Sequence, residues 1–190
     1  LSLHDALPIF KPFIYSAALE NGFTAASLVS GAPIVIEDSI SGDWRPQNYS
    51  RKVFGPTRLR EALSKSLNLV SVRLVRALGV EAVRDYLEKF GFDRARLPQG
   101  LSLALGSATV TPMEIARAYG VFANGGYLVE PFFIARVEDP SGRIVEYANR
   151  QMLCSGCGIP ISESSDSSQP SPDLRFSQQV VSPQNAFILD

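Results

Sequence analysis

The sequence predicts an α+β fold in which helices come first and strands come late. Apolar residues recur at helical spacing through most of the first 124 residues, and an apolar pair of strands flanks a turn near residue 141. No internal repeat is visible at any period. The chain has 190 residues, of which 45% are hydrophobic and 19% are charged, so it can build one core. Helices and strands in separate runs are typical of segregated layers.

The first predicted element is a buried helix of about three turns, followed by a long surface loop. Pro12 suits the first helical turn, Asn21-Gly22 ends the helix, and its apolar residues recur at helical spacing: Phe10, Phe13, Ile14, Ala17 and Ala18. Residues 23–56 are irregular and contain the turn-rich stretch SGDWRPQNYS. We expect Trp44 and Tyr49 to anchor this loop.

Three short helices are predicted next. Thr57 is expected to cap the first, which runs to about Lys65. The second covers about 69–78 and closes at Gly79, and the third covers about 81–90 and closes at Gly91.

The clearest helix start lies at TPME, residues 111–114. Thr111 is the predicted N-cap, Pro112 the first helical residue, and Glu114 completes a capping box. This helix is expected to end at residues 124–126, NGG. The stretches FFIARVED and RIVEYA then predict a hairpin around Pro140-Ser141-Gly142.

Residues 150–181 predict a mobile insertion, because Ser, Pro, Gln and Asp dominate and bury too little apolar area to offset the entropy of ordering. Both cysteines, Cys154 and Cys157, lie in this segment. Their spacing suits half of a zinc site, but no second pair or neighbouring histidine completes it. A local disulfide and a reducible pair without function are the alternatives.

Both ends of the sequence suggest a fragment. Residues 1–9, LSLHDALPI, resemble translated sequencing-adaptor read-through, so we expect a non-native leader followed by a partial domain at 10–190. At the other end, Ser182 and Pro183 begin a predicted helix that has barely two turns before Asp190.

Composition excludes several classes of function. A net charge of −1 gives no reason to expect a nucleic-acid partner. No apolar run is long enough to span a bilayer, and no secretion signal is visible. The one histidine, His4, lies in the suspected leader, so a Ser/His/Asp or Cys/His constellation has no base. No metal site, cofactor or Gly-rich phosphate loop is predicted, and acyl-transfer chemistry would have to use lysine.

Lys11, at the head of the first helix, and the pair Ser66 and Asn68 are the candidate functional residues. A lysine there can simply point into water. Ser66 and Asn68 are two residues apart, about 200° around a continuous helix, so they face one site only if the helix breaks between them, with Asn68 as the next N-cap. The alternative is that Asn68 caps a helix and Ser66 is a tolerated polar interruption.

Four phrases resemble the transpeptidase domain of class A bifunctional penicillin-binding proteins: FKPFIYSAALENG, FGPTRLREALSKSLNLVSVRL, LALGSATVTPMEIARAYGVFANGGYLVEP and VSPQNAF. They occur in the family's order and cover roughly residues 10–149 and 178–190. The family carries three short motifs, S-x-x-K, S-D-N and K-T-G, of which the second is present here as Ser66-Leu67-Asn68. The resemblance implies the helical part of a penicillin-binding-protein or β-lactamase-like fold with a late hairpin.

The resemblance also implies roles for three residues. Lys11 matches the lysine of S-x-x-K, which removes the proton of the nucleophilic serine. Ser66 would pass a proton to the leaving amine, and Asn68 would hold the amide of the acyl donor and help to position Lys11. The implied reaction is acyl transfer from D-Ala-D-Ala stem peptides of peptidoglycan through a serine ester, without a cofactor. β-Lactams imitate the donor. A parent of this kind would act at the periplasmic face of the inner membrane, held there by an N-terminal anchor.

The sequence departs from the family pattern where the nucleophile should stand. Pro8, three residues before Lys11, occupies the position of the serine, and no K-T-G is present. Ser16 is about 140° from Lys11 around the helix and does not replace it. We therefore expect the chain as written to be inactive. The alternative is an inactive homologue that serves as a binding or scaffolding module in cell-wall synthesis.

Overall fold

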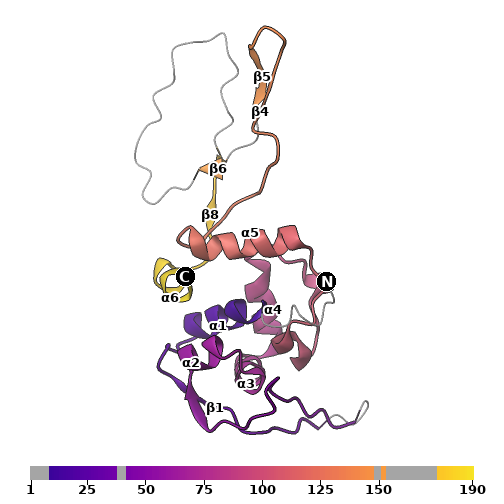
Figure 1. Ribbon diagram of the computed structural model, residues 1–190, viewed down its shortest axis with the longest axis vertical. Helices are drawn as coiled ribbons and strands as arrows, with labels where there is room; N and C mark the ends of the chain where they lie inside the picture. The colour runs from indigo at the N-terminus through magenta and orange to yellow at the C-terminus, as the bar shows by residue number, and fades with distance from the viewer. Residues whose placement is uncertain (1–8, 38–41, 148–150, 153–174) are drawn as a thin grey trace.

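Helices form the body of the molecule, and a hairpin extends away from it (Figure 1). The computed structural model describes residues 9–37, 42–147, 151–152 and 175–190. Within these residues the α-helices are α1 (Lys11–Glu20), α2 (Leu59–Ser64), α3 (Asn68–Leu78), α4 (Val80–Glu88), α5 (Pro112–Ala123) and α6 (Pro183–Leu189). Two 3₁₀ helices, η2 (Arg94–Arg96) and η3 (Leu101–Leu105), lie between α4 and α5.

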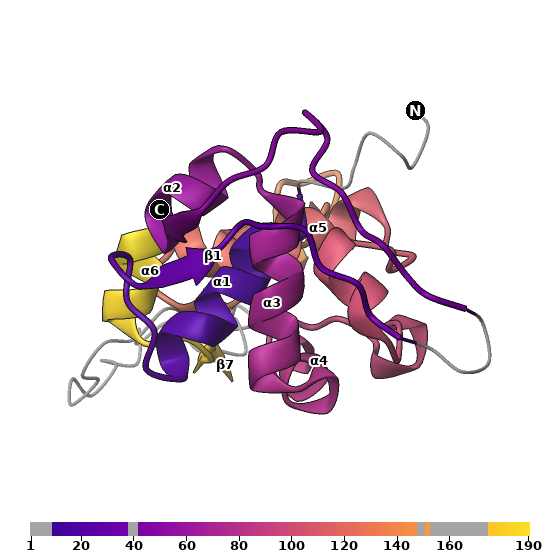
Figure 2. The same cartoon turned by 90° about the horizontal axis from the view of Figure 1, so that it is seen from below.

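The predicted first helix is confirmed as α1, which is central to the core. It lies between α3 and α6, as the view from below shows (Figure 2). Phe13 is fully buried, and its ring meets aromatic rings from the segments after α4 and from α5: Phe90, Phe92, Tyr119 and Phe122. The centroid distances of 5.1 to 5.4 Å are in the range of favourable aromatic pairs. This cluster fixes the helix that carries Lys11.

The region predicted as a long loop contains a short strand. β1 (Leu28–Ser30) pairs antiparallel with β2 (Pro56–Arg58), in register Val29 with Thr57. The prediction that Thr57 caps a helix is therefore wrong, because its backbone belongs to this ladder. Helix α2 starts two residues later without a side-chain cap.

Of the two residues predicted to anchor the loop, one does so and the other does not. Trp44 forms a backbone bridge with Ile36 and packs against the core, as expected. Tyr49 is 99% exposed, so the expectation that it anchors the loop is wrong. Arg73 of α3 has that role: its guanidinium donates to the carbonyl oxygens of Ser30 and Ala32, at 3.1 and 2.6 Å, and of Pro33 at 3.3 Å.

Helix α5 begins at the predicted capping box. The Thr111 hydroxyl accepts from the Glu114 backbone N–H at 3.2 Å, and the Glu114 carboxylate accepts from the Thr111 N–H at 2.7 Å. Two orphan donors of the first turn are thus satisfied by local residues alone.

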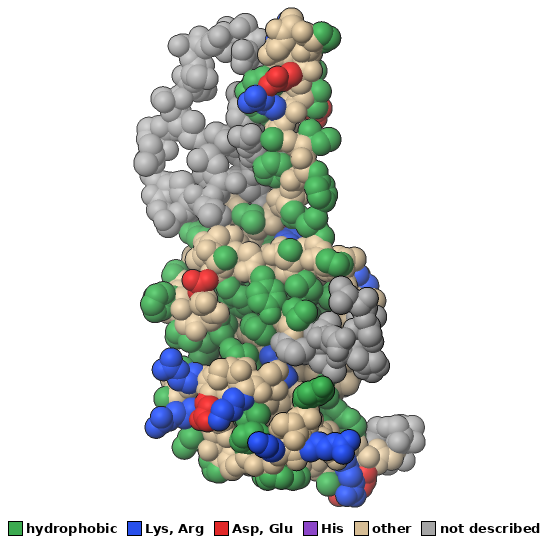
Figure 3. All heavy atoms as spheres, in the orientation of Figure 1, with side chains coloured by type: hydrophobic (Ala, Val, Ile, Leu, Met, Phe, Trp, Pro, Cys, Tyr) green, Lys and Arg blue, Asp and Glu red, His purple; other side chains and the backbone are tan. Residues whose placement is uncertain are grey.

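The predicted hairpin is confirmed as β4 (Arg136–Glu138) and β5 (Ile144–Tyr147). Asp139 organises its turn, since one carboxylate oxygen accepts from the backbone N–H groups of Ser141 and Arg143. Green apolar side chains cover much of the visible face of this arm (Figure 3). Among the exposed ones are Phe133, Ile134 and Val145. The predicted α+β class holds, although every sheet within the described residues has two strands.

The segment before α6 rejoins the body at a glycine. β3 (Tyr127–Leu128) pairs with β8 (Gln178–Gln179), and the Gly126 carbonyl accepts from the N–H groups of Val180 and Val181. Val181 is buried in the core, so residues 178–181, which the sequence suggested as the end of an insertion, belong to the folded body. The other short pair joins β6 (Gln151–Met152) to β7 (Arg175–Phe176) in parallel.

Helix α6 starts at the predicted cap and is held to α1 by a buried polar network. The Ser182 hydroxyl accepts from the Asn185 N–H at 3.3 Å. The Asn185 amide donates to the carbonyl oxygen of Ser16 and to the carboxylate of Glu20, at 3.0 and 2.9 Å. Residues 1–8 of the suspected leader at 1–9, most of the expected insertion and the cysteine pair Cys154 and Cys157 lie outside the described residues.

Candidate active site

The side chain of Lys11 is buried and makes three hydrogen bonds at the junction of α2 and α3. Its exposed fraction is 2%. The Nζ atom donates to the Ser66 hydroxyl at 2.7 Å, to the Ser66 carbonyl oxygen at 2.8 Å and to Asn68 Oδ1 at 2.7 Å. An ammonium group has three protons, so these acceptors use all of its donors. The structure therefore brings together the three residues that the sequence singled out.

Ser66 reaches Lys11 because the chain breaks between two helices. Helix α2 ends at Ser64 and α3 begins at Asn68. Ser66 has φ of 52°, in the left-handed region that residues with a Cβ rarely adopt. This reversal turns both its hydroxyl and its carbonyl oxygen toward Lys11. The predicted break is present.

Asn68 is the first residue of α3, so the prediction that it is the N-cap is wrong. The N-cap position belongs to Leu67, which is extended and has no side-chain cap. The Asn68 amide is engaged instead on both sides, with Oδ1 toward Lys11 and Nδ2 donating to the Gln47 carbonyl at 2.9 Å. The ammonium form of lysine can only donate and a carbonyl can only accept, so chemistry fixes which end of the amide faces which partner.

Burial lowers the pKa of Lys11 from 10.5 to about 8. Lys11 is also the first residue of α1, and its amine lies at the first residue of α3, so the positive ends of two helix dipoles further disfavour its charge. The three acceptors favour the ammonium form and oppose this shift. In the described part of the chain, no carboxylate bonds to the amine. The result is a lysine poised to exchange a proton near neutral pH.

Ser16 faces away from this site, as the helical spacing predicted. It is fully buried, and its hydroxyl lies 2.7 Å from the Tyr86 hydroxyl and 3.1 Å from Asn185 Oδ1. Its oxygen is committed to the network that holds α6 and is closed to a substrate.

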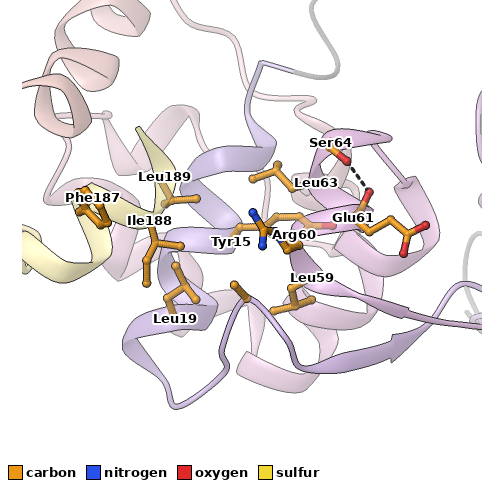
Figure 4. A pocket seen from close by; sticks show the side chains of 11 residues that line it. Tyr15, Leu19, Leu59, Arg60, Glu61, Leu63, Ser64, Phe187, Ile188 and Leu189 are labelled. Carbon is orange, nitrogen blue, oxygen red and sulfur yellow. Dashed lines mark hydrogen bonds between the residues drawn. The ribbon is translucent and has the colours of Figure 1, made fainter.

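A groove of about 870 Å³ runs between α1, α2 and α6, and its lining does not include the Lys11 site. Apolar side chains supply most of its walls, and Arg60 and Glu61 also line it (Figure 4); the apolar ones include Leu19, Leu59, Leu63, Ile188 and Leu189. Its walls lack Lys11, Ser66 and Asn68, so the groove is separate from the hydrogen-bonded cluster at the helix junction.

A cluster of metal ligands and a helix able to span a membrane are both absent from the residues that the structure describes. No group of three or more His, Cys, Asp or Glu side chains there could hold a metal ion. Over the same residues, no helix has both the length and the apolar character needed to cross a membrane.

Sequence reasoning missed the loop residues that surround the junction. Gln47 supplies its carbonyl oxygen to Asn68, and Asn48, which is 4% exposed, accepts from the Leu69 N–H at 3.2 Å. Both stand in the stretch PQN, which the sequence suggested only as part of a turn-rich loop. Two polar residues after a proline do not indicate, from the local sequence, that they bond Asn68 and Leu69, each 21 residues later.

Comparison with known proteins agrees with the resemblance seen in the sequence. The family model for the penicillin binding protein transpeptidase domain matches residues 9–186. Penicillin-binding protein 1A of Pseudomonas aeruginosa is 57% identical over 141 residues, which are 74% of this chain and 17% of that protein. The Escherichia coli protein of the same name is 45% identical over 152 residues, 80% of this chain and 18% of that protein. The chain thus spans under a fifth of the length of these curated relatives.

Solved structures show the same fold. The crystal structure of penicillin-binding protein 1A from Haemophilus influenzae has a TM-score of 0.82 at 36% identity, and the match covers 94% of this chain and 28% of that one. A penicillin G acyl-enzyme complex of penicillin-binding protein A from Mycobacterium tuberculosis has a TM-score of 0.71 at 24% identity, covering 95% and 40%. With the family model matching nearly the whole sequence, this chain belongs to the family of penicillin-binding protein transpeptidase domains.

Proposed function

We propose that this chain carries the proton-transfer part of a serine D,D-transpeptidase that cross-links peptidoglycan. The observation that supports it most directly is the Lys11 amine, which is buried and bonded to Ser66 and Asn68. Family membership supplies the substrate class, D-Ala-D-Ala stem peptides, and the class of inhibitor, β-lactams. No cofactor is needed, because every step is a proton or acyl transfer.

In the proposed acylation, neutral Lys11 takes the proton of the serine hydroxyl as the serine oxygen attacks the carbonyl carbon of the penultimate D-alanine. The tetrahedral intermediate then collapses and the C–N bond to the terminal D-alanine breaks. The leaving nitrogen receives a proton from the Ser66 hydroxyl, which is replenished by Lys11 at 2.7 Å. An amine of a neighbouring strand then attacks the ester carbonyl carbon, the C–O bond to the serine breaks, and the proton lost by the amine passes through Lys11 to the serine oxygen. Asn68 holds Lys11 and binds the amide of the donor peptide.

Lys11 suits this role because it must be neutral to accept a proton. A pKa of about 8 leaves roughly one molecule in ten neutral at pH 7, against fewer than one in a thousand at 10.5. Burial of the amine at the junction of α2 and α3 thus supplies the base.

Pro8 occupies the position of the nucleophile, so we propose that the chain as written forms no serine ester. If Pro8 is native, the same observation favours a second function, a binding or scaffolding module in cell-wall synthesis. Independent amplification and sequencing of the source DNA across codons 1–10 separates the two. A Ser-x-x-Lys in that DNA supports the enzyme, and a confirmed proline supports the scaffold.

A chimera tests the roles of the three residues without depending on Pro8. Residues 10–147 of this chain would replace the matching residues of the Pseudomonas aeruginosa relative, which keeps its own residues on both sides. We expect the chimera to be acylated by a fluorescent penicillin, as measured on gels. Lys11→Ala in the chimera should lower the acylation rate at least 100-fold, which is at the low end of what one positioned acid-base group contributes.

Two outcomes of this experiment bear on the proposal. Acylation of the Lys11→Ala chimera at the parent rate would remove Lys11 from the mechanism. Extending the exchanged segment to include Pro8 should abolish labelling, and persistence of labelling would mean that the nucleophile lies elsewhere.

We further propose that the parent protein works at the periplasmic face of the inner membrane, where peptidoglycan is built. This rests on the proposed substrate and on the relatives named penicillin-binding protein 1A. An anchor upstream of this segment would supply the membrane attachment. Fractionation of cells that express the full gene, followed by protease treatment of spheroplasts, tests this placement.

A further inference from the structure

The loop segment 42–52 touches the Lys11 site at the start of α3. The backbone carbonyl of Gln47 accepts from Asn68 Nδ2 at 2.9 Å. The next side chain, Asn48, is 4% exposed although its neighbours on both sides are exposed. A buried amide within a surface loop must have its polar atoms satisfied, and its partners show what the loop does.

The Asn48 side chain joins the loop to the helix. Its Oδ1 accepts from the Leu69 N–H at 3.2 Å, and its Nδ2 donates to the Lys52 carbonyl at 3.0 Å. The Asn48 carbonyl also accepts from the Arg51 N–H at 2.9 Å, which closes a tight turn. One side chain thus holds the turn together and ties it to another element.

Helix α3 needs this bond because it has no cap of its own. The N-cap residue Leu67 has an apolar side chain, and no acidic residue stands in the first turn. The first N–H groups of a helix lack partners within the helix, and leaving a buried one unsatisfied is costly. Asn48 supplies the acceptor from 21 residues away, in place of the usual local Ser, Thr, Asp or Asn.

The consequence reaches Lys11 through Asn68. Asn48 is fixed on Leu69 and, within its own turn, on the Lys52 carbonyl. Together these two bonds hold the adjacent Gln47 carbonyl opposite Asn68 Nδ2. That carbonyl accepts only from the NH₂ end of the amide, so Oδ1 is left facing the Lys11 amine at 2.7 Å. Without the carbonyl, the Asn68 amide is free to rotate and its donor end can face the lysine.

We propose that Asn48 is a positioning residue for the Lys11 site: it caps α3 from outside and places the Gln47 carbonyl that orients Asn68 toward the lysine. This inference rests on the proposed function only in giving Lys11 a catalytic role. The geometry itself is independent of it, and so is the test.

The test measures the ionisation of Lys11 in the full 190-residue chain. Trace acetylation with acetic anhydride over a pH series, read by mass spectrometry of the Lys11 peptide, gives the midpoint of its reactivity, with Lys89 as the internal reference for the reagent. In Asn48→Ala we expect the loop to detach and water to reach the amine. The midpoint should move upward by about one pH unit, which lowers the neutral fraction at pH 8 about five-fold.

Asn185→Ala is the matched control. Asn185 is also 4% exposed and its side chain also joins two elements, but it lies at the other end of α1, where it bonds Ser16 and Glu20. Both variants should lose stability, whereas only Asn48→Ala should move the Lys11 midpoint. An unmoved midpoint in a folded Asn48→Ala chain, or an equal movement in Asn185→Ala, overturns the proposal.

Asn48→Asp covers the case in which the alanine variant does not fold. It keeps an oxygen for the Leu69 N–H, so α3 retains its cap, but the Lys52 carbonyl loses its donor and the turn loosens. The Lys11 midpoint should again move upward and remain displaced at about 0.5 M salt, where an added charge is largely screened. A displacement that disappears in salt reflects only the new charge and contradicts the positioning role.

The acetylation readout also separates this inference from the proposed function. Failure of the chimera to react with penicillin would refute the transpeptidase role and leave the Lys11 midpoint unaffected. A midpoint insensitive to Asn48 would refute the positioning role and leave penicillin acylation unaffected.

Discussion

Lys11 binds Ser66 twice, because its amine donates to both the hydroxyl and the carbonyl oxygen of that residue, at 2.7 and 2.8 Å. These two bonds hold Ser66 at φ of 52°. A left-handed backbone costs a residue with a Cβ about 1 to 2 kcal/mol. The hydroxyl that faces the lysine is thus presented by a locally strained backbone.

Ser66→Gly should therefore be more stable than Ser66→Ala. Both lose the hydroxyl, whose hydrogen bond to a charged group is worth about 1.5 to 3 kcal/mol, but glycine also relieves the backbone strain. We expect alanine to lower the free energy of unfolding by about 1.5 to 3 kcal/mol and glycine to lower it by about 1 to 2 kcal/mol less, as measured by urea denaturation. The reverse order would place Ser66 in an ordinary backbone conformation.

The stability of the chain should rise with pH between about 8 and 10 because of Lys11. The unfolded chain releases this proton near pH 10.5 and the folded chain near pH 8, so the unfolded state binds more protons in between. After allowance for solvent screening, the gain should be about 1 to 2 kcal/mol. The Lys11→Met variant should not show this gain in stability between about pH 8 and 10.

The parent chain must be compared with Lys11→Met because buried tyrosines make the stability fall, and not rise, as the pH increases. Burial raises the pKa of Tyr86 to about 12, so unfolded tyrosines lose protons first and stability falls above about pH 10. This fall is common to both chains and cancels in their difference. Parallel pH profiles for the two would show that Lys11 has an ordinary pKa.

Thr111→Ala should lower the free energy of unfolding by about 1 kcal/mol, since the first turn of α5 loses its side-chain acceptor.

The Arg96 side chain and the Thr111 N–H lower the pKa of Glu114 to about 2. Its contribution to stability is therefore present above about pH 4.5 and is lost as the pH falls toward 2. Glu114→Gln keeps the reach of the capping box and should flatten this acid limb in thermal melts. An unchanged limb would assign it to other carboxylates.

Gly126→Ala should be far more damaging than Gly125→Ala. Both glycines have positive φ, 102° and 79°. A Cβ on Gly125 meets nothing within 4 Å, whereas one on Gly126 collides with the backbone carbonyl of Val181. We expect about 1 kcal/mol for Gly125→Ala and more than 3 kcal/mol for Gly126→Ala, measured by chemical denaturation. Similar costs at both positions would mean that Val181 does not approach this turn.

The parts of the fold that could be predicted are those that the local sequence encodes. The Thr111 capping box, the Ser182 cap and the hairpin turn each depend on residues within four positions of one another. The break between Ser66 and Asn68 was predictable because a two-residue spacing suits only a broken helix if both side chains face one site. Helical geometry also excluded Ser16.

The parts that could not be predicted depend on distant partners. Thr57 has the composition of a cap, but its backbone pairs with β1, which is nearly thirty residues earlier and only three residues long. Asn68 does not occupy the expected cap position, and its side chain bonds Lys11 instead. The N–H group at the start of α3 is capped by Asn48 from the loop. No periodicity within either segment carries this information.

The three bonds of Lys11 also bear on the order in which the protein folds. Each joins residues 55 or 57 positions apart, whereas α3 and α4 are neighbours separated by a single glycine. Closing a loop of that length costs about 3.5 kcal/mol beyond the constant term, so local helix pairs should form first and α1 should dock afterwards. Until α1 docks, Lys11 is solvated and has the proton affinity of any surface lysine. The lowered proton affinity of Lys11 is therefore acquired late in folding, and a chain with all of its helices but an undocked α1 would lack it.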